Sequence, residues 1–108
     1  MPAYLVAFCR GVSDRKALEA YWANVAPSFE GTGAKPLVAY TPFEKLEGPG
    51  WVEGVVMVEF PSVEIAKRWY TSPAYEEVKK LREGAAVFDL VLAEGGAVPW
   101  AARMPHIK

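Results

Sequence analysis

The segment at residues 55–60, Val-Val-Met-Val-Glu-Phe, constrains the fold more than any other part of the chain. Successive side chains of a strand point to opposite faces, and here both faces are apolar except at Glu59. Such a segment is typical of a strand in the middle of a sheet. Pro61 has no N–H to donate and ends the ladder, and Ser62 is placed to cap a helix that continues through Trp69. The sequence therefore predicts a central strand followed at once by a helix.

Proline, glycine and helix-capping residues divide the rest of the chain into similar units. Pro27 is expected to kink or fray the end of a first helix. Ser72 and Pro73 interrupt the second helix and restart it, because Ser caps well and Pro fits the first helical turn; Gly84 then ends it. Residues 42–54 are rich in Gly and Pro and predict a long connection. The expected elements are strands at residues 3–9, 35–41, 55–60 and 87–94, and helices at residues 14–29, 62–70 and 73–83.

The order of these elements is strand, helix, strand, strand, helix, strand. This order predicts an α+β protein with the ferredoxin-like βαββαβ plan, in which the helices cover one face of a four-stranded antiparallel sheet. The domain is expected to span residues 1–96. Residues 97–108 form a Pro-broken tail, which is either mobile or docked on a partner subunit.

The second face of the predicted sheet needs a cover. All four strands carry apolar side chains on both faces, but the helices cover only one. A soluble monomer rarely exposes an apolar patch larger than roughly 300–600 Å². A second copy of the chain would suit this face, and an interface of about 1,600 Å² is the standard size for a stable pair. We therefore predict a homodimer formed sheet against sheet.

Charge and cysteine content exclude several partners. Twelve Lys and Arg residues against thirteen Asp and Glu residues give a formal net charge of -1, so the chain has no general attraction to nucleic acid or anionic lipid. The single cysteine, Cys9, cannot form an internal disulfide. No segment resembles a signal peptide or a membrane span. These features predict a cytoplasmic protein with no nucleic-acid or membrane partner.

Metal and cofactor sites lack the necessary residue types. His106 is the only histidine and lies in the tail, so the domain offers no His–carboxylate cluster, haem ligand or Ser-His-acid triad. Gly31 and Gly33 follow a predicted helix and lack the third glycine of a dinucleotide motif. We expect no metal and no cofactor.

The densest group of polar and aromatic residues lies on and after the second helix, at Trp69, Tyr70, Ser72, Tyr75 and Arg82. Trp69 and Tyr75 could form the walls of a pocket between helix and sheet, and Ser72 could supply a hydrogen bond. Arg82 could bind a carboxylate or an enolate-like oxygen through two N–H groups. In the alternative, Trp69 packs in the core, Ser72 caps a helix and Arg82 pairs with an acid such as Asp14 or Glu59.

Three further residues are candidates for the same pocket. Glu59 is a carboxylate on an otherwise apolar strand, where burial would raise its pKa into the range of acid–base catalysis. An ion pair with Arg10, with Arg82 or with a partner-subunit cation is the alternative for Glu59, as it is for Asp89. Asp14 is either a helix cap or an acid at the pocket mouth. Tyr21 lies on the apolar face of the first predicted helix.

Residues spread over positions 2–96 resemble a family of small bacterial proteins catalogued as domain of unknown function thirteen-thirty. The most specific part is Glu-Phe-Pro-Ser at 59–62, followed at fixed spacing by Trp-Tyr, Ser-Pro and Tyr. One departure is Gly31-Thr32-Gly33, where the family commonly has a Gly pair. The resemblance implies the dimeric α+β-barrel superfamily, which includes cofactor-free monooxygenases, haem-degrading enzymes and isomerases. The residues that carry it include Tyr4, Ser13, Asp14, Tyr21, Leu46, Glu47, Gly48, Ala66, Trp69, Tyr70, Ser72, Pro73, Tyr75, Arg82 and Asp89.

Three functions fit these observations. The first is a homodimer that binds a small apolar or aromatic carbonyl or carboxylate compound in a cleft between sheet and helices. The second is a cofactor-independent enzyme of the monooxygenase or isomerase type. The third is a structural or interaction module with no ligand. An enzyme requires a carboxylate or tyrosine with a strongly perturbed pKa in the cleft, and Arg82 or Tyr75 directed inward.

Overall fold

The computed structural model describes residues 1–107. Helices and strands follow one another in the order that the sequence predicts, and two short 3-10 helices are added to them. The elements are β1 (Ala3–Val12), α1 (Arg15–Asn24), η1 (Ala26–Phe29), β2 (Lys35–Ala39), β3 (Gly54–Phe60), α2 (Val63–Tyr70), α3 (Pro73–Lys79), β4 (Ala86–Glu94) and η2 (Trp100–Ala102), where η marks a 3-10 helix.

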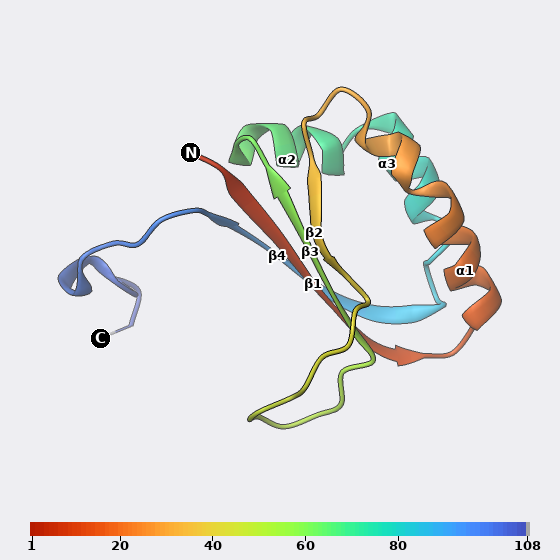
Figure 1. The fold of residues 1–108 in the computed structure, drawn as a ribbon, viewed down its shortest axis with the longest axis horizontal. Coiled ribbons are helices and arrows are strands. Elements are labelled where there is room, and N and C mark those ends of the chain that lie inside the picture. Colours follow the sequence, from red (N-terminus) through yellow and green to blue (C-terminus); the bar gives the residue numbers. More distant parts are fainter. Residues whose placement is uncertain (108) are drawn as a thin grey trace.

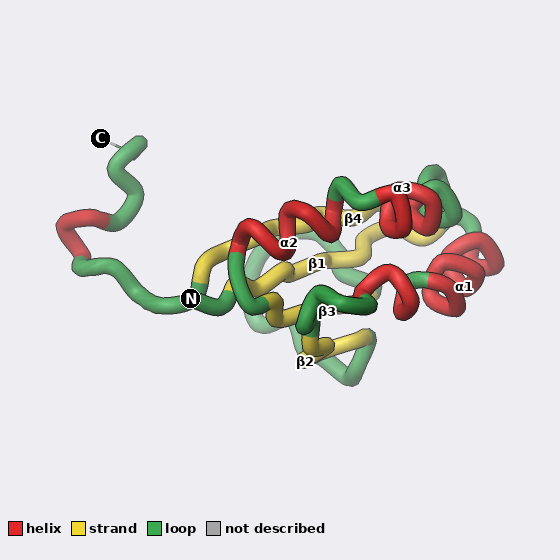
Figure 2. The backbone as a smooth tube through the Cα atoms, turned by 90° about the horizontal axis from the view of Figure 1, so that it is seen from above, coloured by secondary structure: helices red, strands yellow, loops and turns green. Residues whose placement is uncertain are grey.

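The four strands form one antiparallel sheet in the order β2-β3-β1-β4. Helices α1, α2 and α3 all lie on one side of this sheet (Figures 1 and 2). This arrangement confirms the predicted α+β class and the ferredoxin-like plan. The predicted central strand, β3, lies between β2 and β1.

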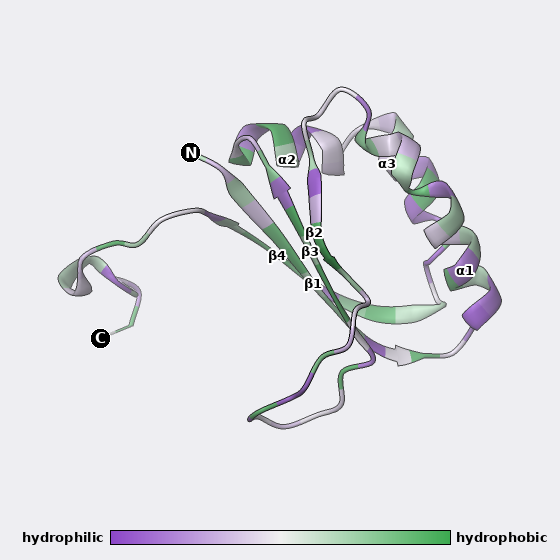
Figure 3. Cartoon of the chain, viewed as in Figure 1, coloured by the Kyte–Doolittle hydropathy of each residue, from purple (hydrophilic) through white to green (hydrophobic). Residues whose placement is uncertain are grey.

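The alternation along β1 and β3 divides the side chains between the two faces of the sheet. On the helix-covered face, Cys9, Val58 and Phe60 are buried. On the other face, Val6 pairs with Met57 of β3 and with Val91 of β4. No helix of residues 1–107 lies on this outer face, and 55% of Val91 is exposed there. Strands β1, β3 and β4 are largely hydrophobic along their length (Figure 3). The middle of the outer face is therefore apolar, as the sequence predicts, although Glu59 and Asp89 also lie on this face.

The first helix ends earlier than predicted. α1 stops at Asn24, and η1 replaces the expected last turn up to Phe29. The cause is Pro27, which has no N–H for an α-helical hydrogen bond. The Ser28 N–H instead reaches the carbonyl three residues back, on Val25, at 3.0 Å.

Three other boundaries also differ from the sequence prediction. β1 continues past a register shift after Cys9, so Val12 pairs with Ala86. β2 ends at Ala39 because Tyr40 has a φ of 58° and leaves the extended conformation. α3 ends at Lys79 rather than near residue 83, and 3-10-type bonds continue the chain from there toward Arg82.

All three predicted helix caps are present. Asp14 Oδ1 accepts a hydrogen bond from Ala17 N at 3.1 Å, and Ser62 Oγ accepts one from Ile65 N at 3.2 Å. Ser72 Oγ accepts from Tyr75 N at 3.2 Å and so begins α3 directly after α2. Because this cap turns the chain between the two helices, it sets the positions of Trp69 and Tyr75 relative to each other.

The C-terminal segment leaves the end of β4 and runs away from the body of the domain (Figure 1). Trp100 in η2 is 84% exposed, and Met104 and Ile107 are also exposed. The last residue of the predicted tail, Lys108, lies outside the described residues. Within residues 1–107, every helix is too short or too polar to cross a bilayer.

Candidate functional site

A cleft of about 290 Å³ lies between the sheet and the helix layer, and almost all of its lining is apolar or aromatic. Small-molecule sites in proteins are typically concave and apolar, with a few polar groups that orient the ligand. Here the polar groups come from α1, from α3 and from the turn after α3. The lining residues are Leu5, Ala7, Tyr21, Trp22, Val25, Ala26, Phe29, Pro36, Ala39, Tyr40, Val56, Val58, Trp69, Tyr75, Arg82, Phe88 and Leu90.

Tyr21, Tyr75 and Arg82 form one hydrogen-bonded network in this cleft. The hydroxyls of Tyr21 and Tyr75 are 2.9 Å apart, and Arg82 Nη2 donates to the Tyr75 hydroxyl at 3.3 Å. The two tyrosine rings meet edge to face, with centroids 6.4 Å apart. Tyr75 is fully buried, so its hydroxyl is held in place by the surrounding core. The network thus joins three of the residues that the sequence singled out.

Arg82 is a half-buried cation without an acidic partner. No carboxylate of residues 1–107 lies within ion-pair distance of it, and the predicted alternative of a pair with Asp14 or Glu59 is not formed. Its guanidinium instead lies over the rings of Phe88 and Tyr21, at 4.9 and 5.6 Å from their centroids. Burial by itself lowers the pKa of Arg82, but the hydrogen bond and charge interactions with the two tyrosines outweigh it. The guanidinium therefore stays charged.

The two phenols leave a hydrogen-bond donor unused. Either hydroxyl can donate in the Tyr21–Tyr75 bond, so one of the two O–H protons has no acceptor among the described residues. Arg82 uses one N–H on Tyr75 and keeps the others. Burial is the largest of the effects that raise the pKa of Tyr21, and this phenol remains protonated at neutral pH. Together these groups offer donors to an acceptor atom such as a carboxylate or carbonyl oxygen.

Trp22 and Tyr40 line the same cleft, although neither was a candidate from the sequence. Their rings are in edge contact, with centroids 4.8 Å apart. Trp22 Nε1 is buried and has no hydrogen-bond partner within residues 1–107. Burial raises the pKa of Tyr40, and the nearby Trp22 N–H lowers it by a smaller amount. The Trp22 N–H and the Tyr40 hydroxyl are nevertheless not placed for a hydrogen bond. The left-handed backbone of Tyr40 turns its ring toward the cleft, and no local sequence signal marks that turn.

The remaining candidates lie at different places. Trp69 lines the cleft, but Ser72 is occupied as the cap of α3 and Asp14 as the cap of α1. Glu59 pairs with Tyr4 across β1 and β3 on the outer face of the sheet, away from the cleft. Asp89, also on the outer face, forms an ion pair with Arg10 at 2.6 Å. The described part of the chain brings together no three His, Cys, Asp or Glu side chains that could hold a metal ion.

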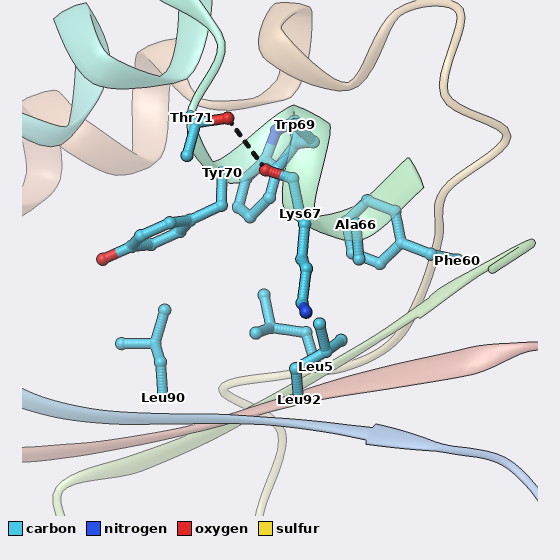
Figure 4. A pocket seen from close by; sticks show the side chains of 9 residues that line it. All are labelled: Leu5, Phe60, Ala66, Lys67, Trp69, Tyr70, Thr71, Leu90 and Leu92. Atoms are coloured by element: carbon cyan, nitrogen blue, oxygen red, sulfur yellow. Dashed lines mark hydrogen bonds between the residues drawn. The ribbon is translucent and has the colours of Figure 1, made fainter. Parts of the chain in front are cut away.

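A second cavity, of about 400 Å³, lies beneath α2 (Figure 4). Leucines of the sheet form its floor, and Ala66, Tyr70 and the stem of Lys67 form its roof. The Thr71 hydroxyl donates to the Lys67 carbonyl at 3.0 Å, so it is already hydrogen-bonded. Leu5, Trp69 and Leu90 line both this cavity and the first cleft.

The fold and its apolar cleft define an α+β protein of the ferredoxin-like class. The chain belongs to the family described as Domain of unknown function (DUF1330), whose profile matches residues 2–96. This match confirms the resemblance noted from the sequence. No curated protein matches the chain.

Solved structures with the same fold include several proteins of unknown function. One from Rhodopseudomonas palustris is 27% identical, with a TM-score of 0.69 over 90% of this chain and 84% of that one. A dimeric ferredoxin-like protein from Jannaschia sp. is 10% identical, with a TM-score of 0.63 over 88% and 100% of the two chains. A dimeric protein with a ferredoxin-like fold from Bacteroides fragilis is 19% identical, with a TM-score of 0.57 over 87% and 95%.

Proposed function

We propose that this protein binds a small carboxylate or carbonyl compound, with the apolar or aromatic body of the compound in the cleft. The observation that carries the proposal is Arg82, a half-buried cation in an apolar cleft with no acidic partner among the described residues. Removing a charged group from water is costly unless it is paired or hydrogen-bonded. A ligand carboxylate would supply the missing partner, and the unused phenol proton would bind its second oxygen.

Trp22 supports the same ligand chemistry independently. A buried N–H without an acceptor costs about 1–3 kcal/mol, and a ligand oxygen or a bound water would remove that cost. The aromatic rings of Phe29, Trp69 and Phe88 provide flat apolar surface for the body of the ligand. The cleft therefore combines apolar walls with donors and has no acceptor-rich or acidic side, which favours an anion or a carbonyl over a cation.

A direct test compares phenylacetate with phenylacetamide, a neutral compound of nearly the same shape. Charge-assisted hydrogen bonds are roughly twice as strong as neutral ones, so phenylacetate is expected to bind about tenfold more tightly. Tryptophan fluorescence and isothermal titration would both report binding, because Trp22 and Trp69 line the cleft. Equal affinity for the two compounds, or binding of neither, would contradict the proposal.

A cofactor-independent enzyme is the second candidate, and one observation favours it. Tyr21 and Arg82 both line the cleft, and because burial raises the pKa of Tyr21 its phenol stays protonated, so the two groups together could donate hydrogen bonds to the oxygen of an enolate. Within the described part of the chain, the cleft lining contains no Asp, Glu or His that could remove a proton as general base. Binding thus remains the better supported function, and catalysis would require a substrate that ionises without a base from the cleft.

We also propose that two copies associate through the outer face of the sheet. Val6, Met57 and Val91 form an apolar row across three strands of this face, and no helix covers it. Two structural neighbours are described as dimeric proteins with the same fold. The exposed Trp100 and Met104 of the C-terminal segment would then lie where a second copy could cover them.

Met57→Glu is expected to convert such a dimer to a monomer, because it places two carboxylates in an apolar interface. Sedimentation at micromolar concentration would measure the change, with the parent chain expected at twice the monomer mass. Leu46→Glu is the matched control, since Leu46 is exposed in the β2–β3 loop. A parent chain that sediments as a stable monomer would contradict the dimer.

A further inference from the structure

We propose that the cleft and the cavity beneath α2 form one elongated site for a straight-chain carboxylate. The carboxylate would lie at Arg82, and the aliphatic chain would pass beneath Trp69 into the second cavity. This inference rests on the proposed function and narrows its ligand from any small carboxylate to an acid with a flexible apolar chain.

The two cavities adjoin each other at a shared set of side chains. Leu5 and Leu90, on the neighbouring strands β1 and β4, line both cavities, and Trp69 of α2 lines both from the helix layer. These three apolar side chains stand between the two cavities, so a chain that passes from one cavity to the other would stay in apolar surroundings. Leucine side chains have rotatable bonds, so the path can adapt to a chain but would be narrow for a rigid ring system.

Trp69 is held firmly, so the roof over this path is fixed. Its indole N–H donates to Ser28 Oγ at 3.0 Å, and its ring stacks on Phe29 with centroids 4.8 Å apart. Ser28 in turn donates to the Val25 carbonyl at 2.6 Å. A rigid ring therefore bounds the first cleft on this side, and the same ring also lines the cavity beneath α2.

Volume also favours a ligand longer than a single ring. The first cleft alone, at about 290 Å³, is just below the range of roughly 300–1,000 Å³ that small-molecule sites span. The cavity beneath α2 adds about 400 Å³. Its lining is mostly aliphatic and aromatic, and the Thr71 hydroxyl there is bonded to the Lys67 carbonyl (Figure 4). The Lys67 stem crosses this cavity, and its exposed ammonium can move into water as a chain enters.

The test is a titration of the whole protein with straight-chain acids from butanoate to decanoate, kept below micelle-forming concentrations. Each buried methylene is expected to raise affinity about three- to fourfold until both cavities are filled, after which the affinity levels off. The corresponding primary alcohols are the control for general hydrophobic binding, and they should bind more weakly at every length. Affinity that stays constant with length would overturn the inference while leaving the proposed function intact.

Lys67→Trp places a ring in the cavity beneath α2, and Arg68→Trp is its matched control. Both residues are exposed neighbours on α2, but only Lys67 lines the cavity. Lys67→Trp is expected to reduce octanoate affinity at least tenfold and to leave butanoate affinity unchanged, whereas Arg68→Trp changes neither. Leu92→Phe fills the same cavity from the sheet and should reproduce the effect if Lys67→Trp folds poorly.

The outcomes separate the two proposals. If the gain with chain length persists in both blocked variants, the chain does not enter the cavity beneath α2 and the inference is wrong. If butanoate, octanoate and phenylacetate all fail to bind the parent protein, the proposed function fails and the inference fails with it.

Discussion

Replacing Arg82 with Met is expected to lower the affinity for phenylacetate by about 10- to 100-fold, the loss typical of a hydrogen bond to a charged group. Among residues 1–107, Arg82 is the only cationic side chain that lines the cleft. Met keeps a long apolar stem against Tyr21 and Phe88, so the substitution removes the charge and the N–H donors with little loss of packing. Isothermal titration of the parent and the variant would measure the difference.

Two further variants show whether the loss comes from the Arg82 group itself. Arg68→Met removes an exposed cation of α2 that lines neither cavity, and it should leave affinity unchanged. Arg82→Lys keeps the charge but loses the planar fork of donors, so it should recover only part of the affinity. If Arg82→Met binds phenylacetate as well as the parent, the carboxylate does not lie at Arg82 and the assigned site is wrong.

The second large effect concerns stability. We expect Trp69→Ala to lower the free energy of unfolding by about 3–5 kcal/mol, as for other large aromatic residues removed from a core. Only 4% of Trp69 is exposed, and its ring lies 4.0 Å from Tyr75 and 5.4 Å from Phe60 between centroids. The stability of a typical domain is about 5–15 kcal/mol, so this one change would leave a marginal fold. Urea unfolding followed by circular dichroism would measure it.

Trp100→Ala is the matched control, because Trp100 is the same residue type in the exposed C-terminal segment. In the isolated chain it should change stability by less than about 0.5 kcal/mol. Trp69→Phe should give an intermediate loss, since it keeps an aromatic ring against Phe29 but removes the hydrogen bond to Ser28. A stable Trp69→Ala variant with an unchanged unfolding midpoint would show that the aromatic cluster contributes little to the fold.

Local sequence signals were enough for most of the fold. The caps at Asp14, Ser62 and Ser72 and the Pro–Ser corner after β3 predicted the element order correctly. Where the predicted ends of helices and strands were wrong, the cause was a local backbone conformation that the sequence signals only weakly. Pro27 was expected only to kink or fray the first helix, but it ended α1 and produced η1, and the left-handed Tyr40 shortened β2.

The site was harder to predict because its residues lie far apart in the sequence. Spacing along α2 and α3 identified Trp69 and Tyr75, but their meeting with Tyr21 depends on a contact across 54 positions. Trp22 has the same helical environment as Tyr21 in the sequence, and only the packing of α1 against the sheet shows that both line the cleft. Side chains alternate along β3, so Glu59 points to the face opposite that of Val58 and Phe60. Glu59 therefore lies away from the cleft residues.

The sequence by itself determined the order of helices and strands, the capped turns and the presence of apolar side chains on both faces of the sheet. These properties follow from φ/ψ preferences and from periodicities of 2 and about 3.6 residues, which act over a few neighbouring positions. Only the tertiary structure decided which face the helices cover and which phenols reach Arg82. When both faces of a strand are apolar, the pattern is the same for either choice, and contacts between distant elements settle it.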